Sequence, residues 1–397
     1  MSVSAPPPVL PRWPLLNLGF RPFFFGASLF AALSVGVWAL VFQYGWSLPL
    51  QGLTPYQWHA HEMVYGYCMA VIAGFLLTAV RNWTDLPTAH GGALALLFAC
   101  WGAARLAMLA GTRYIGAAAL FDGLFTAGLA AAVARPVLRA RQWERAAVLG
   151  KLFLLGGGNA LFYLGVGGGV ENGVFWSVYG GLYLVIGLIL TVGRQLVPYF
   201  IARDSGLPGE MKNYRAVDLG TMALFLLLFF ADLGRLGADW TAAAAGGLFV
   251  LGCARLAGWY SGRIWRNPLL WSLYLAYGSI TLGFLLLAGS AWGYGSRYAA
   301  VHAFAFGGIG LVTLGMMARV SLGHTGRDVK RAPKAVAWAA AAAALGMLFR
   351  VVLPLAAPDS YMLWIGCAQA LWVAAFGLFA AVFVPFWLRP SLDDPLD

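Results

Sequence analysis

One short stretch, from Trp58 to Met63, reads Trp-His-Ala-His-Glu-Met and combines residues that bind metal ions with a residue that moves protons. Two of the chain's five histidines, His59 and His61, lie here beside Glu62, at the start of a long apolar run. Imidazole nitrogens bind iron and copper, and a carboxylate can orient the imidazole or carry protons. Because ionisable side chains are costly in a membrane, this cluster predicts a functional site with Glu62 as its proton-handling residue.

The spacing of His59 and His61 leaves two arrangements open. On a regular helix, residues i and i+2 point about 200° apart, so the two rings would serve two neighbouring centres. In an extended segment both rings would face one side and could chelate a single ion. The alternative without a metal is a pair of interfacial histidines that bind water near Trp58 and Tyr56.

Two more histidines are candidate ligands. His302 lies about four residues inside the apolar segment 298–319, at the same predicted membrane level as His59 and His61. His324 follows the end of that segment, about 22 residues after His302 and roughly 33 Å away along a continuous helix, and cannot join the others unless the chain bends back. Three glycines after His302 admit either close helix packing or a flat macrocycle: Gly307, Gly308 and Gly310.

Arginines at the other ends of three apolar segments suit the carboxylates of a cofactor. Guanidinium binds carboxylate in bidentate fashion, so these side chains are candidates for haem propionates, with membrane anchoring as the alternative. They are Arg21, Arg194 and Arg319. The four cysteines occur singly and no Cys-x-x-Cys-His is present, so any haem is expected to be held non-covalently by histidine.

Composition sets the class of protein that must position these residues. Of 397 residues, 61% are hydrophobic and 10% are charged, which predicts an all-α polytopic membrane protein with short loops. We expect a single integral membrane domain over 1–397 with about twelve transmembrane helices. The expected helices lie near 22–43, 60–80, 91–110, 114–134, 147–168, 174–201, 216–235, 239–259, 268–289, 298–319, 335–353 and 361–387.

The distribution of basic residues predicts the orientation. Most of the 26 lysines and arginines fall at one set of helix ends, and the few at the other set are Arg105, Arg113, Arg235, Arg297 and Arg350. Positive charge favours the cytoplasmic side, so both termini are expected in the cytoplasm and the histidine cluster at the outer face. The net charge of +11 is thus a topology signal, and no nucleic-acid binding is expected. The segment 1–14 lacks the pattern of a cleavable signal peptide.

Three strings give the chain a resemblance to a known family. Trp58-His59-Ala60-His61-Glu62-Met63, the stretch from Gly74 to Thr84, and the stretch from Gly315 to Arg327, with its Leu-Gly-His-Thr-Gly-Arg, look like the NnrS family of bacterial membrane proteins. The resemblance runs from the first helix to the last. It implies a twelve-helix protein of the bacterial inner membrane that carries haem and copper and belongs to the nitric oxide response. By that resemblance His59, His61, His302 and His324 are the candidate ligands.

The expected function combines the two lines of reasoning. We expect a haem b and copper protein that binds nitric oxide and reduces or detoxifies it, in denitrification or nitrosative-stress defence, with an electron donor that the sequence does not identify. His59 or His302 would hold the haem iron, and His61 would serve copper or the opposite axial position. The alternatives are a copper- or haem-handling carrier and a nitric oxide sensor without turnover. A haem-copper oxidase core needs more histidines than the five present.

Overall fold

The computed structural model describes residues 13–206, 211 and 213–393, and it is helical throughout, with no strand in this part of the chain. Twelve of its helices are long and apolar enough to cross a membrane. The all-α fold and the helix number predicted from the sequence are therefore confirmed. Arg12 and Lys212, which the charge distribution assigns to the cytoplasmic side, lie outside the described residues.

Every predicted segment overlaps an observed span, and the ends differ by a few residues. Three spans are continuous but contain a π-helical stretch. In chain order the spans are α1 (Phe20–Tyr44); α2 (Pro55–His61), η2 (Glu62–Cys68) and α3 (Met69–Thr84); α4 (Gly91–Leu109); α5 (Ile115–Arg139); α6 (Ala146–Val166); α7 (Gly173–Ser205); α8 (Arg215–Leu233); α9 (Ala238–Trp259); α10 (Pro268–Ala291); α11 (Arg297–His302), η6 (Ala303–Gly310) and α12 (Leu311–Gly323); α13 (Lys334–Met347), η8 (Leu348–Val352) and α14 (Leu353–Ala356); and α15 (Tyr361–Leu388).

Local capping explains why the second span begins earlier than hydropathy predicts. Thr54 and Gln57 form a capping box, in which each side chain bonds the other residue's backbone N–H, and Pro55 is the first helical residue. The predicted start near residue 60 is therefore wrong by about one turn, because polar residues that cap a helix do not raise hydropathy. As a result, both His59 and His61 lie on α2.

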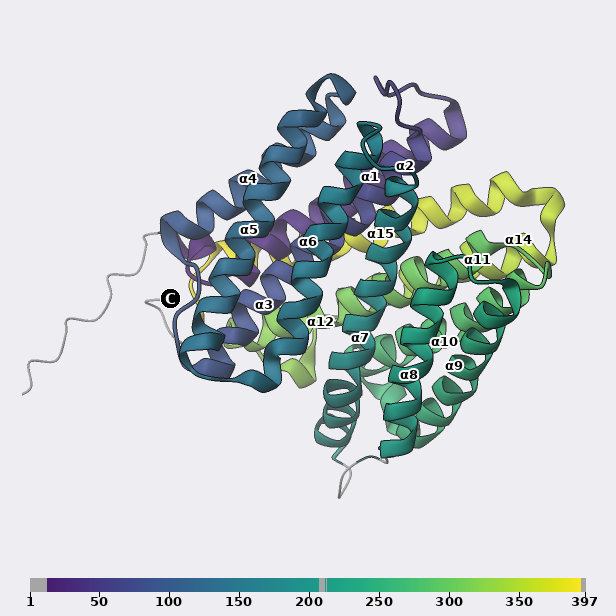
Figure 1. Cartoon of the computed structure of the whole chain (residues 1–397). Helices are drawn as coiled ribbons and strands as arrows, with labels where there is room; N and C mark the ends of the chain where they lie inside the picture. The colour runs from purple at the N-terminus through teal and green to yellow at the C-terminus, as the bar shows by residue number, and fades with distance from the viewer. Residues whose placement is uncertain (1–12, 207–210, 212, 394–397) are drawn as a thin grey trace, which may run out of the picture.

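The helices form two groups that share α7 (Figure 1). On one side α4, α5 and α6 lie in sequence order, and on the other side α8, α9 and α10 do the same. α1 packs along α15 and against α3, so the first and last spans are neighbours. Since the number of spans in the described chain is even, the start of α1 and the end of α15 lie at one face, which we call the termini face. The opposite face, where α1 ends and α2 begins, is the distal face.

Arg21, at the start of α1, ties the two chain ends together. Its side chain is fully buried, and Nη1 donates to the carbonyl oxygens of Phe386 (3.4 Å), Trp387 (3.1 Å) and Arg389 (2.6 Å). A cation at a helix C-terminus satisfies the last carbonyls, which have no partner within the helix. Arg21 therefore caps the end of α15.

Replacement of Arg21 by methionine should lower the free energy of unfolding by at least about 2 kcal/mol, because charged hydrogen bonds to buried carbonyls would be lost. Thermal unfolding in detergent, followed by circular dichroism, measures the effect. Replacement of the exposed Arg235 by methionine is the matched control. Equal melting of both variants would contradict the capping role.

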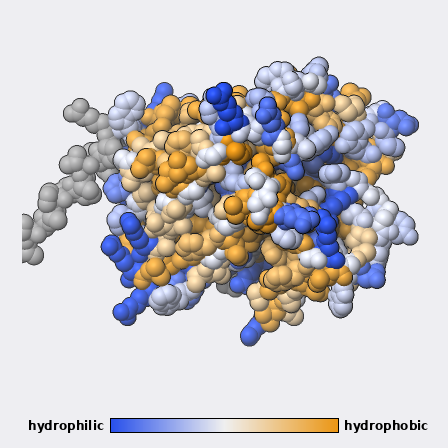
Figure 2. Space-filling model, turned by 45° about the horizontal axis from the view of Figure 1, so that its top comes forward, coloured by the Kyte–Doolittle hydropathy of each residue, from blue (hydrophilic) through white to orange (hydrophobic). Residues whose placement is uncertain are grey.

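The outer surface fits a lipid environment. Apolar residues cover much of the face seen in Figure 2, and strongly hydrophilic ones occur in separate groups. Large apolar side chains remain exposed along several spans, among them Leu33, Leu96, Leu106, Phe230 and Val250. An exposed apolar surface of this extent is expected where lipid replaces water as the solvent.

Candidate functional site

Three π-helical stretches mark the distal half of the molecule. η2 begins directly after His61, η6 begins directly after His302, and η8 contains Arg350. A π-helical turn adds a residue to the helix and shifts the side chains before it, and such turns are frequent at functional sites. Two of the stretches thus adjoin histidines that the sequence analysis names as candidate ligands, His61 and His302. The third contains Arg350, which the sequence analysis assigns to topology.

His59 lies against α1. Its ring stacks on Trp38, with centroids 4.6 Å apart and an interplanar angle of 8°. Its Nδ1 is buried and has no hydrogen-bond partner among the described residues. A buried imidazole nitrogen without a partner is costly, and a metal ion or a polar ligand atom would remove that cost.

His302 is held in one tautomer. Its Nδ1 lies 2.8 Å from the carbonyl oxygen of Tyr298, one turn earlier, and because a carbonyl only accepts, Nδ1 carries the proton. The lone pair is then on Nε2, which accepts from Nη2 of Arg350 at 3.0 Å. A histidine whose Nδ1–H bonds a backbone carbonyl while Nε2 is free of protons is the form that binds metals.

The two histidines and Arg350 form one group, which we call the distal site. Arg350 bonds Nε2 of His302, and His59 lies within electrostatic range of both residues. No group of three or more His, Cys, Asp or Glu side chains in the described part of the chain is placed to hold a metal ion. The distal site therefore offers two imidazoles as candidate ligands, a set that suits haem iron.

His61 points away from the distal site. Its Nδ1 lies 2.9 Å from Oε1 of Glu62, its Nε2 lies 2.9 Å from Oδ1 of Asn159, and its ring packs on Phe162. Both ring nitrogens are engaged within the protein. Of the two arrangements left open by the spacing, the structure has the helical one, in which His59 and His61 face different neighbours.

His61 and Glu62 belong to a buried charge network between α2, α4, α5 and α6. Arg105 bonds Oε1 of Glu62 and both carboxylate oxygens of Asp122, each at 2.5 Å, and all three side chains are at most 5% exposed. Tyr163 donates to Oδ2 of Asp122 at 2.6 Å. One guanidinium thus faces two carboxylates, and a proton on His61, 3.9 Å from Asp122, would balance the charge.

The network comes close to the distal surface through Tyr163. This side chain lines a cavity of about 360 Å³ together with Gln51 and Thr112. Gln51 also donates its backbone N–H to Oγ1 of Thr112, which joins the loop before α2 to the start of the span that contains α5. The hydroxyl of Tyr163 therefore lies between the polar cavity and the buried carboxylate of Asp122.

His324 lies at the other end of the molecule. It caps α12 at the termini face, and its ring is 5.8 Å from that of Phe20. Trp38, which stacks on His59, lies 18 residues further along the same helix α1, about 27 Å at the rise of an α-helix. The structure therefore separates His324 from the distal site, as the spacing predicts.

The three arginines considered for haem carboxylates also lie at the termini face, and each has a partner in the chain. Arg21 bonds the end of α15, Arg194 pairs with Asp218 at 2.8 Å, and Arg319 pairs with Asp204 at 2.6 Å. Arg319 lies 17 residues after His302, roughly 25 Å along the span. A haem held at the distal site cannot reach them, so their proposed role requires a different site for the cofactor.

The glycines after His302 serve close packing. A Cβ added at Gly307 would lie 2.6 Å from Oγ of Ser279, and one at Gly310 would lie 2.7 Å from the ring of Trp372. Gly308 has a similar close neighbour in Ile280. Side chains from α10 and α15 fill this space, so of the two predicted roles the structure has helix packing.

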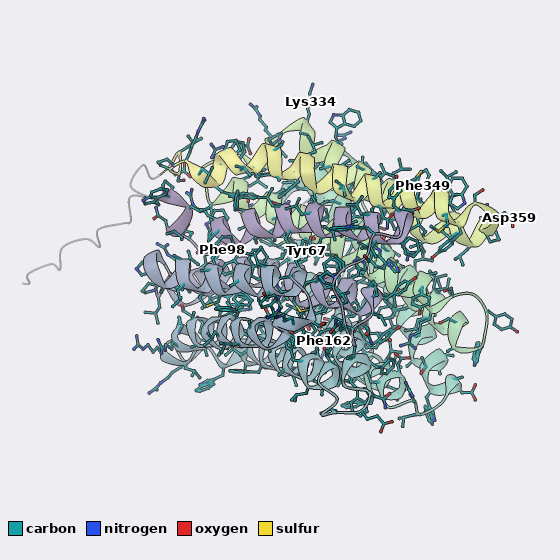
Figure 3. All side chains as sticks on the ribbon, turned by 90° about the horizontal axis from the view of Figure 1, so that it is seen from above. Tyr67, Phe98, Phe162, Lys334, Phe349 and Asp359 are labelled. Atoms are coloured by element: carbon teal, nitrogen blue, oxygen red, sulfur yellow. The ribbon has the colours of Figure 1, made fainter. Side chains whose placement is uncertain are left out.

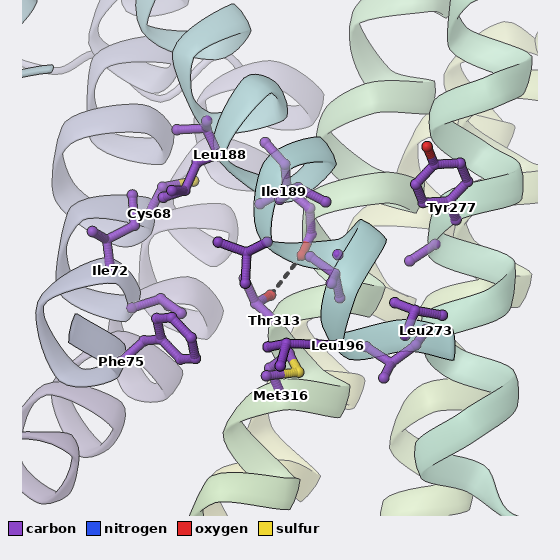
Figure 4. A pocket seen from close by; sticks show the side chains of 18 of the residues that line it. Cys68, Ile72, Phe75, Leu188, Ile189, Leu196, Leu273, Tyr277, Thr313 and Met316 are labelled. Carbon is purple, nitrogen blue, oxygen red and sulfur yellow. Dashed lines mark hydrogen bonds between the residues drawn. The ribbon is translucent and has the colours of Figure 1, made fainter. Parts of the chain in front are cut away.

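An apolar cavity of about 110 Å³ lies between α3, α7, α10 and α12 (Figure 4). Its lining includes Ile72, Leu188, Leu273 and Met316, and Thr313 contributes one of the few hydroxyl groups that face the cavity. Thr313 also bonds the hydroxyl of Tyr67, which lies in the interior between the helix layers (Figure 3). The cavity contains no metal-binding histidine and is separate from the distal site.

Sequence reasoning missed the residues that come from distant helices. From the sequence alone, Arg105 and Arg350 are assigned to topology and Asp122 is given no role. Their signal was present, because each lies inside an apolar segment where a charge is costly. Asn159 and Tyr163 carry no such signal, and only the packing of α6 on α2 reveals them.

Comparison with protein families gives one match: a model described as NnrS protein matches residues 14–391. The match covers almost the whole described chain, including the distal site, the charge network and His324. Comparison with curated proteins gives no match.

Proposed function

This chain belongs to the NnrS family and is a multi-pass membrane protein of the nitric oxide response, and from that premise we propose that it binds nitric oxide at a haem held by the distal site and reduces it. The observation that carries the proposal is His302, whose Nδ1–H is fixed by a carbonyl and whose Nε2 lone pair points at Arg350. His59, with its partnerless Nδ1, is the second ligand. A bound haem would supply the iron atom, and nitric oxide would bind to it in place of one of the two imidazoles.

The residues present fit haem better than they fit a second, separate metal centre. Two imidazoles suit haem iron, and Trp38, which stacks on His59, holds that ring in one orientation. Copper in the same protein is part of the proposal, but it would have to share His59 and His302 or recruit His61 or His324. His61 is engaged with Glu62 and Asn159, and His324 lies at the termini face.

Reduction of nitric oxide consumes protons as well as electrons. Two molecules of nitric oxide, two electrons and two protons give nitrous oxide and water, so one N–N bond forms and one N–O bond breaks. The electrons come from an external donor. We assign proton delivery to the network of Glu62 and Asp122, which the hydroxyl of Tyr163 connects to the polar cavity.

Nitric oxide needs no polar channel to reach the distal site. Nitric oxide is small and dissolves in lipid, so it can enter between helices and through apolar cavities such as the one beside Thr313. The proposed location is the bacterial inner membrane with both termini in the cytoplasm, which places the distal site towards the outside. The excess of arginine at the termini face supports this orientation.

Turnover separates the enzyme from the carrier and the sensor. We expect the purified protein, supplied with an artificial electron donor, to consume nitric oxide and form nitrous oxide, and we expect the His302→Ala variant to lose this activity. A gas-sensitive electrode and headspace analysis measure the two gases. Binding without consumption would favour a sensor, and transfer of haem or copper to an acceptor protein without consumption would favour a carrier; either result contradicts the proposed reduction.

A further inference from the structure

Arg350 is a cation without a counter-charge. The ion pairs in the described part of the chain involve other arginines, and no carboxylate lies within ion-pair range of Arg350. Its known partners are neutral: Nε2 of His302 at 3.0 Å, and Tyr361. A half-buried guanidinium in a membrane protein is costly when it is not paired, so this position requires a further explanation.

Arg297 shows what a structural arginine looks like at the same face. It lies five residues before His302, and it forms two hydrogen bonds to Asp232, at 2.7 and 2.6 Å. Asp232 also accepts from Tyr183 at 2.7 Å, so the carboxylate is fully used. Arg350 has no carboxylate partner equivalent to Asp232 among the described residues. This is so although Arg297 and Arg350 both lie at the distal ends of their spans.

The partner that Arg350 does have is unusual. A guanidinium has five N–H donors in a planar fork that matches the two oxygens of a carboxylate or of a small oxyanion. Here one of those donors bonds the lone pair that a metal ion would use on His302. Binding of a metal at Nε2 would therefore displace Arg350 and free its donors next to the bound group.

We propose that Arg350 is an anion-binding residue of the distal site: it covers the lone pair of His302 when the site is empty and pairs with an oxyanion when the site is filled. The shared chemistry is a planar group with two oxygens and one negative charge. It can come from a carboxylate of the macrocycle or from a small inorganic anion such as nitrite. The metal-linked part of this proposal rests on the proposed function, while the binding of a free anion does not.

Three variants test the assignment. Arg350→Gln removes the charge, Arg350→Lys keeps the charge but loses the fork, and Arg235→Gln removes an exposed arginine at the same face that has no ion pair among the described residues. Two readouts are made on the full chain in detergent. The first is the rate at which the purified protein gives up haem to an excess of a haem-free acceptor globin, and the second is calorimetric titration with nitrite.

A role in holding the macrocycle predicts that Arg350→Gln loses haem about 10- to 100-fold faster than the wild type, the factor expected for a charged hydrogen bond, with Arg350→Lys in between. A role in holding the small anion predicts nitrite affinity weakened by a similar factor in Arg350→Gln. In both cases Arg235→Gln should behave as the wild type.

Unchanged haem loss together with unchanged nitrite binding in both Arg350 variants would overturn the proposal. If the wild-type protein binds no haem, the proposed function fails, and the nitrite titration alone then decides on Arg350. If Arg350→Gln does not fold, Arg350→Lys gives the comparison, because it keeps the charge and a similar volume.

Discussion

Replacement of Arg105 by methionine should lower the free energy of unfolding by about 3–5 kcal/mol, one of the largest effects expected for a single change in this chain. The guanidinium is the one arginine or lysine side chain that pairs with Glu62 and Asp122 in the described structure, and all three are buried. Removing it leaves two carboxylates without a counter-charge in a medium of low dielectric constant. Gly66 contributes to this fit, because an added Cβ there would lie 2.9 Å from Nη1 of Arg105.

Thermal unfolding and denaturant titration in detergent measure the loss. The control is Arg235→Met, which removes an exposed arginine near the same face and should melt as the wild type. A second comparison adds Glu62→Gln and Asp122→Asn to Arg105→Met, which removes all three charges and should recover much of the stability. An Arg105→Met protein as stable as the control would show that the network does not hold α2, α4 and α5 together.

The histidines of the Trp-His-Ala-His-Glu-Met stretch should separate into two classes when they are replaced. His59→Ala and His302→Ala should each reduce haem affinity on the order of 100-fold or more, since loss of a ligand exceeds the 10- to 100-fold cost of losing a residue that only orients one. His59→Ala removes a buried neutral ring, and His302→Ala removes one of the two neutral partners of the half-buried Arg350, which keeps Tyr361. Both proteins should therefore fold, and haem content after purification, measured by optical absorbance and iron analysis, reports the loss.

His61→Ala should behave in the opposite way. It removes one hydrogen-bond partner from each of Glu62 and Asn159, at a cost of roughly 1–3 kcal/mol, but it removes no nitrogen from the distal site. His324→Ala, at the termini face, should also retain haem. Loss of haem from His61→Ala or His324→Ala at normal stability would contradict this division and would favour the four-histidine ligand set implied by the family resemblance.

The fold was predictable from composition, because twelve apolar stretches in a chain of this length leave little choice in a membrane. What hydropathy does not record is the capping that starts α2 at Pro55 and the π-helical turns after His61 and His302. These turns depend on packing between spans. As a result, the level of the histidines in the membrane was predicted, while the direction in which each ring points was not.

The candidate site was predictable only in part. His59 and His302 could be assigned to one level because each lies near a helix end at the same face. The division of His59 from His61 depends on Asn159 and Trp38, which belong to other helices and have no signature in the sequence. Arg105 and Arg350 illustrate a general limit of sequence interpretation. A charged residue near a helix end is interpreted as a topology signal, and only the structure shows which partners it has.

Optical spectroscopy of the purified wild-type protein tests the central claim most directly. The reduced protein should show the absorbance of a non-covalent haem, with iron close to one atom per chain, and the spectrum should shift when nitric oxide is added. A shift that disappears in His302→Ala would locate the gas at the distal site. A wild-type protein that contains neither iron nor copper when produced with both metals and haem in supply, and that does not respond to nitric oxide, would contradict the account.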